Sequence, residues 1–119
     1  MRLKFFILIL ATLSTNVFLG QTKKKALSEK EKIEVLISSI EQLKNAQFNR
    51  NGSLYDAKTA AKHLRSKLKN AGDDIKTVQD FIEHIASKSS MTGKEYKIIF
   101  SNGKEVTTRT FFNEILKKI

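Results

Sequence analysis

The first twenty residues differ in composition from the rest of the chain. Two cations, Arg2 and Lys4, precede an apolar stretch over residues 5–19 that a few polar residues interrupt. This order is typical of a secretory signal peptide, and a stretch of roughly 15 residues falls short of the about 20 that a bilayer-spanning helix needs. We therefore expect residues 1–20 to be a signal peptide cleaved near Gly20. The mature protein would then keep no membrane span and lie in the periplasm or outside the cell.

The mature chain must fold around one hydrophobic core. Roughly 99 of the 119 residues remain after cleavage, which is enough for one domain and too few for two. The sequence contains no cysteine, so disulfides, thiolate metal ligands and lipid attachment are excluded. We expect a single domain over residues 28–119. Residues 21–27, with Lys23, Lys24 and Lys25, are expected to be a basic, disordered mature N-terminus.

The chain is basic, with a formal net charge of +10 at pH 7. A basic surface favours an anionic neighbour, which in a cell envelope would be a lipid headgroup, a cell-wall component or an envelope protein. A solvated basic surface without any cognate anion is the simpler alternative. We expect no nucleic-acid partner, because the protein is expected to be exported and its aromatic residues are not interleaved with lysine and arginine.

Side-chain caps predict where the helices begin. Ser28 and Glu31 have the spacing of a capping box. Asp56, Thr77 and a threonine at position 107 or 108 are placed to cap three further helices. With the apolar periodicity that comes after each cap, these signals predict helices over residues 28–45, 56–71, 77–87 and 107–119.

Two asparagine-glycine pairs mark turns. Asn102-Gly103 lies between apolar residues 96–100 and Val106, which predicts a β-hairpin whose two-residue turn has positive φ at both positions. Asn51-Gly52 lies in residues 47–53, which are predicted to be a loop whose Phe48 plugs the core. The predicted fold is α+β, a small single domain of about four helices with one β-hairpin near the C-terminus.

Catalytic and metal-binding motifs are scarce. The two histidines, His63 and His84, fall on separate predicted helices without ligand spacing, so we expect no metal and no cofactor. Two polar groups stand out, one on the second predicted helix and one in a predicted polar loop over residues 87–93. If they meet, they would form a pocket for an anion or a carbonyl oxygen; otherwise the loop residues only satisfy backbone groups. The two groups are His63, Arg65 and Lys67, and Ser89, Ser90, Thr92 and Gly93.

Short motifs in a fixed order add a family resemblance. They are Asn51-Gly52-Ser53 with Tyr55, Ala60-Ala61, His63-Leu64-Arg65, Lys67, Ala71-Gly72, Asp80-Phe81-Ile82, Ala86-Ser87, Ser89-Ser90, Thr92-Gly93, Tyr96 and Asn102-Gly103. Together they resemble the YfeK-like family of small exported bacterial proteins, over roughly residues 33–119. The chain departs from the family pattern in having Phe111-Phe112 where a tryptophan is expected, and Asn102 where aspartate is common.

The resemblance implies an exported single domain but no activity, because the family is one of unknown function. It marks the two polar groups, and Asn51 with them, as candidate binding residues without saying whether they bind a ligand or brace the fold. We expect first a monomeric, non-enzymatic binding or accessory module that engages an anionic or carbonyl-rich envelope partner.

Two alternatives remain open from the sequence. A small hydrolase would use Ser89 or Ser90 with His63, which requires a serine oxygen within about 3.2 Å of a ring nitrogen. A purely structural envelope protein would use the polar loop to hold the hairpin against the helices.

Overall fold

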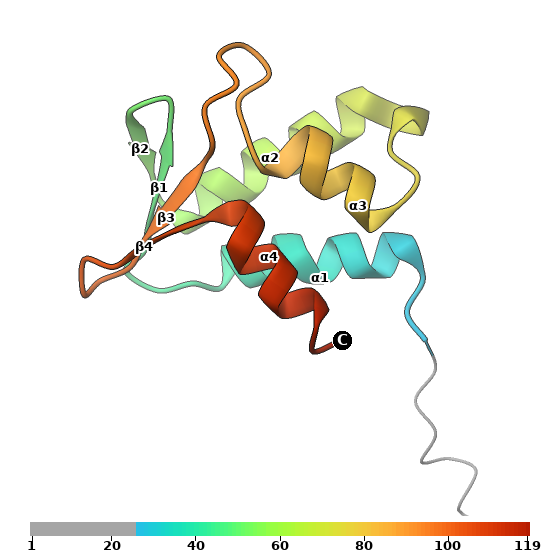
Figure 1. Cartoon of the computed structure of the whole chain (residues 1–119), viewed down its shortest axis with the longest axis horizontal. Coiled ribbons are helices and arrows are strands. Elements are labelled where there is room, and N and C mark those ends of the chain that lie inside the picture. Colours follow the sequence, from blue (N-terminus) through green and yellow to red (C-terminus); the bar gives the residue numbers. More distant parts are fainter. Residues whose placement is uncertain (1–25) are drawn as a thin grey trace, which may run out of the picture.

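The computed structural model describes residues 26–119, so the expected signal peptide and nearly all of the expected basic segment lie outside the described residues. Residues 26–119 form four α-helices and a four-stranded antiparallel sheet. The helices gather at one end of this unit and the sheet lies at the other (Figure 1). The α+β class is therefore as predicted, although the sheet is larger than one hairpin.

The first helix, α1 (Glu29–Glu41), begins where the capping box predicts. The Ser28 Oγ accepts a hydrogen bond from the N–H of Glu31, whose carboxylate accepts one from the N–H of Ser28 at 2.8 Å. The helix ends earlier than predicted, and Asn45, which was expected inside it, has a left-handed φ of 58°. Its buried face carries Ile33, Leu36, Ile37 and Ile40.

The segment predicted to be a loop is a β-hairpin instead. Strand β1 (Gln47–Arg50) pairs with the antiparallel strand β2 (Ser53–Tyr55). Between them Asn51 and Gly52 have φ values of 55° and 86°, the conformation of a two-residue type I′ turn. The loop prediction is wrong because strands this short show no clear apolar alternation. Phe48 is 5% exposed and fills the core as expected.

The second helix, α2 (Ala57–Ala71), has the predicted bounds. The Asp56 carboxylate accepts a hydrogen bond from the N–H of Thr59 at 2.8 Å, and the helix stops at Gly72. Buried alanines face α1, and small side chains allow the two helices to approach closely. A 3₁₀ turn, η3 (Gly72–Asp74), comes next.

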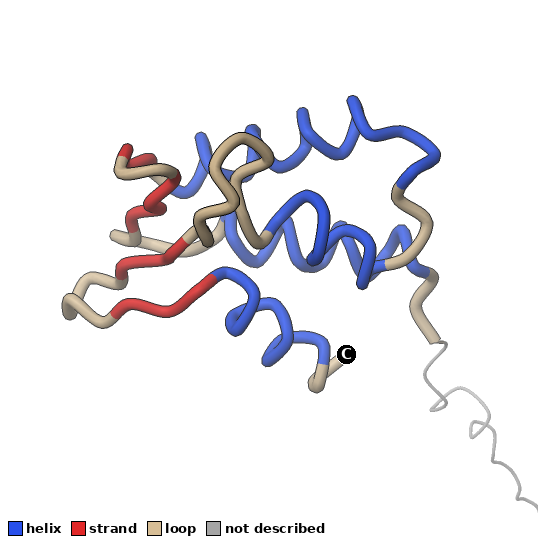
Figure 2. Tube along the Cα trace, turned by 45° about the horizontal axis from the view of Figure 1, so that its top comes forward, coloured by secondary structure: helices blue, strands red, loops and turns tan. Residues whose placement is uncertain are grey.

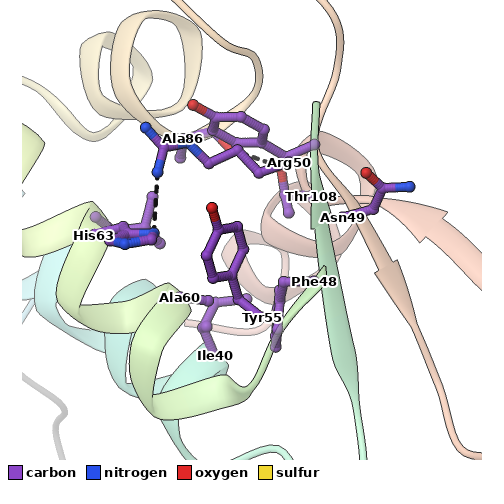
Figure 3. Close-up of a pocket in the computed structure, with 11 residues that line it drawn as sticks. Ile40, Phe48, Asn49, Arg50, Tyr55, Ala60, His63, Ala86 and Thr108 are labelled. Atoms are coloured by element: carbon purple, nitrogen blue, oxygen red, sulfur yellow. Dashed lines mark hydrogen bonds between the residues drawn. The ribbon is translucent and has the colours of Figure 1, made fainter. Parts of the chain in front are cut away.

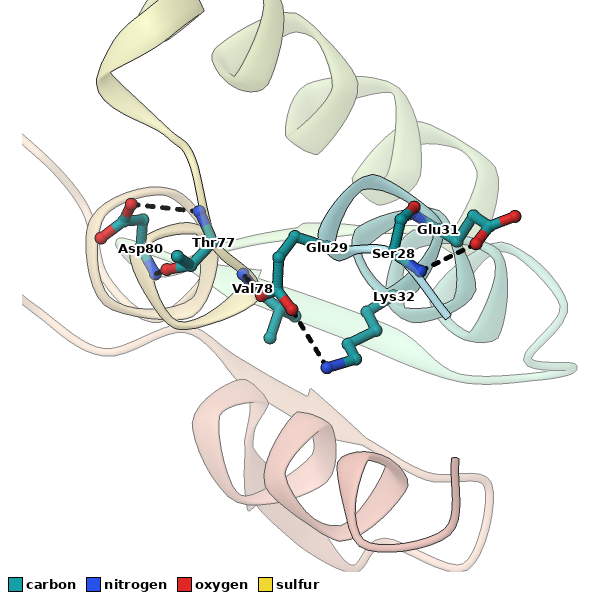
Figure 4. A network of polar contacts seen from close by, with 7 residues as sticks. All are labelled: Ser28, Glu29, Glu31, Lys32, Thr77, Val78 and Asp80. Carbon is teal, nitrogen blue, oxygen red and sulfur yellow. Dashed lines mark hydrogen bonds and ion pairs between the residues drawn. The ribbon is translucent and has the colours of Figure 1, made fainter. Parts of the chain in front are cut away.

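The third predicted helix consists of α3 (Val78–Phe81) and a π-helical turn, η4 (Ile82–Ala86). Thr77 caps it and forms a capping box with Asp80. Glu29 ties this helix to α1, because its carboxylate accepts a hydrogen bond from the N–H of Val78 at 2.8 Å (Figure 4). The two helix N-termini are therefore held together.

The hairpin predicted near the C-terminus is present, with β3 (Lys97–Ile99) and β4 (Glu105–Thr107). Its turn differs from the prediction, because at Asn102-Gly103 only the glycine has positive φ, at 88°. The N–H of Phe100 donates to the carbonyl of Lys104, so the loop has three residues, the arrangement of a type I turn followed by a left-handed glycine.

The two hairpins join into one sheet with the strand order β2-β1-β3-β4. The joint is the antiparallel pairing of β1 with β3, in which Phe48 lies opposite Ile98. On the other side of β1, Phe48 lies opposite Tyr55. These residues share the face of the sheet that packs against the helices, which makes β1 the centre of the inner surface.

The last helix, α4 (Thr108–Leu116), is capped by Thr107 and ends before Ile119, which is 47% exposed. Phe112 is fully buried and its ring lies 6.0 Å from that of Phe81. Helix α1 contacts each of the other three helices, so it forms the centre of the helical end (Figure 2). None of the helices in residues 26–119 combines the length and the apolar character needed to cross a membrane.

Candidate functional site

Four of the expected binding residues form a brace between the β1–β2 turn and the loop that precedes β3. The side-chain amide of Asn51 donates to the Ser89 Oγ at 3.0 Å, and the Thr92 hydroxyl donates to the Asn51 Oδ1 at 2.6 Å. Ser89 is 4% exposed, and its Oγ also accepts from the N–H groups of Met91 and Thr92. The N–H of Gly93 donates to the Ser89 carbonyl at 2.9 Å. The loop is thereby fixed to the hairpin turn.

Ser90 does not take part in this brace. It is exposed, and its hydroxyl has no hydrogen-bond partner in residues 26–119. Neighbouring serines thus have opposite environments, one enclosed by donors and one facing solvent.

Arg65 lies apart from the other candidate residues. Its guanidinium forms ion pairs with Glu34 at 2.6 Å and Glu41 at 3.1 Å, both on α1. Residues two positions apart on a helix do not share a face, whereas residues four apart do. His63 and Lys67 therefore lie on one side of α2, and Arg65 on another.

His63 contacts an arginine that the sequence did not single out. The Nη1 of Arg50, at the end of β1, lies 3.1 Å from the Nδ1 of His63 (Figure 3). Arginine stays protonated and can only donate, so Nδ1 is the acceptor and the neutral ring carries its proton on Nε2. Burial lowers the pKa of His63 below its ordinary value of 6.5, and the charges of Arg50 and Lys62 lower it further.

Tyr55 completes this side of the site. Its ring meets that of His63 edge-on, with the centroids 4.8 Å apart and the planes at 79°. Its hydroxyl points toward the space between Arg50 and His63 (Figure 3). In the part of the chain that the structure describes, this hydroxyl has no hydrogen-bond partner, so it remains available to a ligand.

These side chains border a cavity of about 40 Å³ between α2 and the inner face of the sheet. Figure 3 shows Ile40 and Ala60 at the end of the cavity away from Arg50. Thr108 also lines the cavity, but its hydroxyl is engaged with the Ala86 carbonyl at 2.6 Å. The lining residues are Ile40, Phe48, Asn49, Arg50, Tyr55, Ala60, His63, Leu64, Ala86, Tyr96 and Thr108.

A second cation adjoins the cavity through Tyr96. The Lys67 Nζ donates to the Tyr96 hydroxyl at 3.0 Å and to the Ile85 carbonyl at 2.9 Å. Continuing the β1–β3 register by one residue places Tyr96 opposite Arg50, and both line the cavity. We term this group, Arg50, Tyr55, His63, Lys67 and Tyr96, the cationic corner.

The cationic corner differs from the other arginine sites of residues 26–119 in its charge balance. Arg65 is paired with two carboxylates and Arg109 with Glu83. Within those same residues, neither Arg50 nor Lys67 has a carboxylate within ion-pair distance. The corner therefore holds two positive charges whose hydrogen-bond partners in residues 26–119 are neutral acceptors.

Arg50, Tyr55 and Tyr96 were not among the expected binding residues. Both tyrosines belong to the motifs that carried the family resemblance, and Arg50 directly precedes the Asn51-Gly52 turn. One signal in the sequence could have shown that His63 and Lys67 share a face of the second helix without Arg65. His63 and Lys67 are four positions apart, whereas Arg65 is two positions from each.

The residues that the structure describes include no group of three or more histidine, aspartate or glutamate side chains placed to hold a metal ion. Over the same range neither Ser89 nor Ser90 forms a hydrogen bond with His63, whose Nδ1 is occupied by Arg50. The serine–histidine contact on which the hydrolase alternative depends is not formed.

The fold and the corner define a small α+β domain with a mainly apolar cavity, bordered by Arg50, between a helix and a four-stranded sheet. The chain belongs to the family of unknown function DUF5329, whose model matches residues 27–119. It is 40% identical over 68 residues to the uncharacterized protein YfeK of Salmonella typhimurium strain LT2. The match covers 57% of each chain, so this chain spans little more than half the length of its curated relative. No solved structure matches it.

Proposed function

We propose that the protein is an exported, non-enzymatic binding module that holds an anionic or carbonyl-rich ligand of the cell envelope at the cationic corner. The polar loop over residues 87–93 positions the site, because its hydrogen bonds to Asn51 fix the turn that comes directly after Arg50. In this proposal the loop does not contact the ligand, which binds to residues of α2 and β1 instead.

The observation that carries this proposal is the missing counter-charge. Arg50 and Lys67 are both partly buried, and neither has a carboxylate partner within residues 26–119. Partial burial of a cation without a counter-ion is unfavourable, and an anion that binds at the corner would relieve this cost. The fully solvated surface considered from composition does not account for a partly buried cation, Arg50, in the wall of a cavity.

The hydrogen-bonding groups of the corner select the same ligand chemistry. Arg50 has five N–H donors and uses one of them on His63 within the described chain. The Tyr55 hydroxyl and the His63 Nε2–H are further donors. A site composed of donors favours carboxylate, phosphate or carbonyl oxygen, and charge-assisted bonds to arginine are the stronger ones.

Anion binding is tested by titrating the ¹⁵N-labelled protein with sodium acetate and with sodium phosphate, with the amide and His63 ring signals as the readout. The proposal expects saturable shifts around the corner. Arg50→Met and Lys67→Met should each weaken binding at least about tenfold, from the free energy of hydrogen bonds to charged groups. Arg65→Met is the matched control, because Arg65 lies on the same helix as Lys67 but outside the corner, and this variant should bind the anions like the wild type. The absence of saturable shifts with either anion, or equal weakening by Arg65→Met, would overturn the proposal.

Export is tested separately by fractionating cells that express the full chain. A periplasmic product whose N-terminus lies near Gln21 is expected. Full-length protein in the cytosol would contradict export while leaving the binding proposal intact.

A further inference from the structure

The surface of the cavity is almost entirely apolar, and polar groups border it at one end. Arg50, His63 and the Tyr55 hydroxyl lie around that end, opposite Ile40 and Ala60 (Figure 3). The apolar side chains that line it are Ile40, Phe48, Ala60, Leu64 and Ala86. A ligand that fits this arrangement needs a charged head and a hydrocarbon tail.

The volume of the cavity limits the size of that tail. An apolar cavity of roughly 150 Å³ binds benzene, so a cavity of about 40 Å³ accommodates only a few carbon atoms. Apolar cavities of this kind are poorly occupied by water and bind hydrocarbon groups. An isopropyl group, with three carbon atoms, has the right size, and a six-carbon chain or an aromatic ring is too large.

The neighbouring polar groups do not compete for the same space. The Thr108 hydroxyl is held by the Ala86 carbonyl, and the Asn49 side chain accepts a hydrogen bond from the N–H of Gly52. The groups left to meet a ligand head are therefore the Arg50 guanidinium, the Tyr55 hydroxyl and the Nε2–H of His63. Arg50 and Tyr55 can both donate to one carboxylate while its tail enters the cavity.

We propose that the cationic corner binds a short, branched aliphatic carboxylate, with the carboxylate on Arg50 and the branched tail in the cavity. This inference rests on the proposed anion-binding function and adds the identity of the tail. Branched aliphatic carboxylates occur as free short-chain acids and at the C-terminal valine of a peptide, where the Cα separates the carboxylate from the isopropyl group.

The test compares the dissociation constants of acetate, isobutyrate and hexanoate for the purified full-length protein, measured by NMR titration at one ionic strength. Burial of each added carbon is expected to tighten binding about fourfold, which predicts that isobutyrate binds about fifteenfold more tightly than acetate. Hexanoate should bind more weakly than isobutyrate because its tail exceeds the cavity. Equal affinities for the three acids would overturn the tail assignment and leave the anion site standing, whereas no binding of any acid would overturn both.

Two variants test whether the tail binds in the cavity. Ala60→Leu fills the space and should remove the preference for isobutyrate while acetate still binds. Ile40→Val enlarges the space by one carbon and should shift the preference toward a five-carbon branched acid, isovalerate. Ile40→Val is a mild core change, so it tests the inference even if Ala60→Leu fails to fold. An unchanged order of affinities in a folded variant would overturn the inference.

The source of the carboxylate is distinguished with the tripeptide Gly-Gly-Val and its C-terminal amide. Tighter binding of the tripeptide than of isobutyrate assigns the site to a peptide terminus, and weaker binding assigns it to a free acid. The amide should bind at least about tenfold more weakly than the free tripeptide, because it lacks the charge that Arg50 meets. Equal binding of amide and acid would contradict the placement of the carboxylate on Arg50.

Discussion

The Arg50 guanidinium donates a hydrogen bond to Nδ1 of His63 at 3.1 Å, which links strand β1 to helix α2 at the edge of a cavity. The bond fixes the imidazole in its neutral form, because a protonated Nδ1 would face the guanidinium with no lone pair to offer. A positively charged residue is thus oriented by a neutral acceptor rather than by a carboxylate, and its charge remains available to a ligand.

Removing Arg50 is expected to raise the pKa of His63. Arg50→Met deletes one of the two cations that lower this pKa, while burial of the ring, the largest cause, remains. The pKa should therefore rise but stay below 6.5. NMR titration of the ring protons measures it, with the exposed His84 as internal control and Arg65→Met as matched variant. An unchanged His63 titration in Arg50→Met would contradict the contact.

Stability should depend on pH through the same ring. The lowered pKa of His63 means that the unfolded chain binds its proton at higher pH than the folded protein does. The free energy of unfolding is therefore expected to fall as the pH drops below about 6.5, toward the lowered pKa. His63→Gln, which stays neutral, should lose this slope.

Carboxylates with a lowered pKa change the stability of the protein in a lower pH range than His63 does. Hydrogen bonds from backbone N–H groups are the largest cause of the lowered pKa of Glu29 and Asp80, whose ordinary values are 4.5 and 3.8. The pKa of Asp56 is lowered from 3.8 by hydrogen bonds from the side chain and then the backbone N–H of Thr59. Their contribution is complete above those values and is lost as the pH falls below them. Urea unfolding between pH 7 and 5 consequently isolates His63, and identical slopes for wild type and His63→Gln would contradict the prediction.

Ligand binding should reverse the shift of His63. A carboxylate on Arg50 lies close to the ring and favours its charged form, so the pKa of His63 should rise when isobutyrate binds. By linkage the affinity for isobutyrate should increase as the pH is lowered from 7 to about 5.5, a range in which the acid stays ionised. Affinity that falls over this range would place the carboxylate elsewhere.

The neighbouring serines of the polar loop should differ sharply in their effect on stability. Ser89→Ala leaves the Asn51 amide and two backbone N–H groups without their acceptor in a buried site, and should cost about 1–3 kcal/mol. Ser90→Ala alters an exposed side chain and should stay within about 0.5 kcal/mol. Chemical denaturation of both variants decides the role of the loop, since equal effects would contradict the brace.

Thr108 is expected to be a structural residue although it lines the cavity. Its buried hydroxyl donates to the Ala86 carbonyl, so Thr108→Val leaves that carbonyl unpaired and should cost about 1–3 kcal/mol. Thr110→Val is the matched change at an exposed position of the same helix. It should cost less than Thr108→Val, because the bond that its hydroxyl accepts from the Thr107 hydroxyl is exposed to solvent. Thermal unfolding measures both, and a neutral Thr108→Val would show that the bond contributes little.

The helices could be predicted because their signals are local. Ser28, Asp56, Thr77 and Thr107 each accept a hydrogen bond from a backbone N–H three residues later, which a single stretch of sequence can reveal. The same local chemistry predicted that Asn51-Gly52 is a turn. It could not show that the turn belongs to a hairpin, because strands of three or four residues carry too little periodicity.

Local patterns of residues were sufficient to predict the α+β class, the beginnings of the four helices and the family to which the chain belongs. The candidate site, in contrast, is assembled by contacts between segments that are distant in the chain. Arg50 and His63 are 13 positions apart, and Tyr96 joins them only because β1 pairs with β3. Such pairing is stabilised by contacts between distant segments, so no local pattern of residues records which strand lies beside which. Cavity, cation and histidine therefore come together only when the chain has folded.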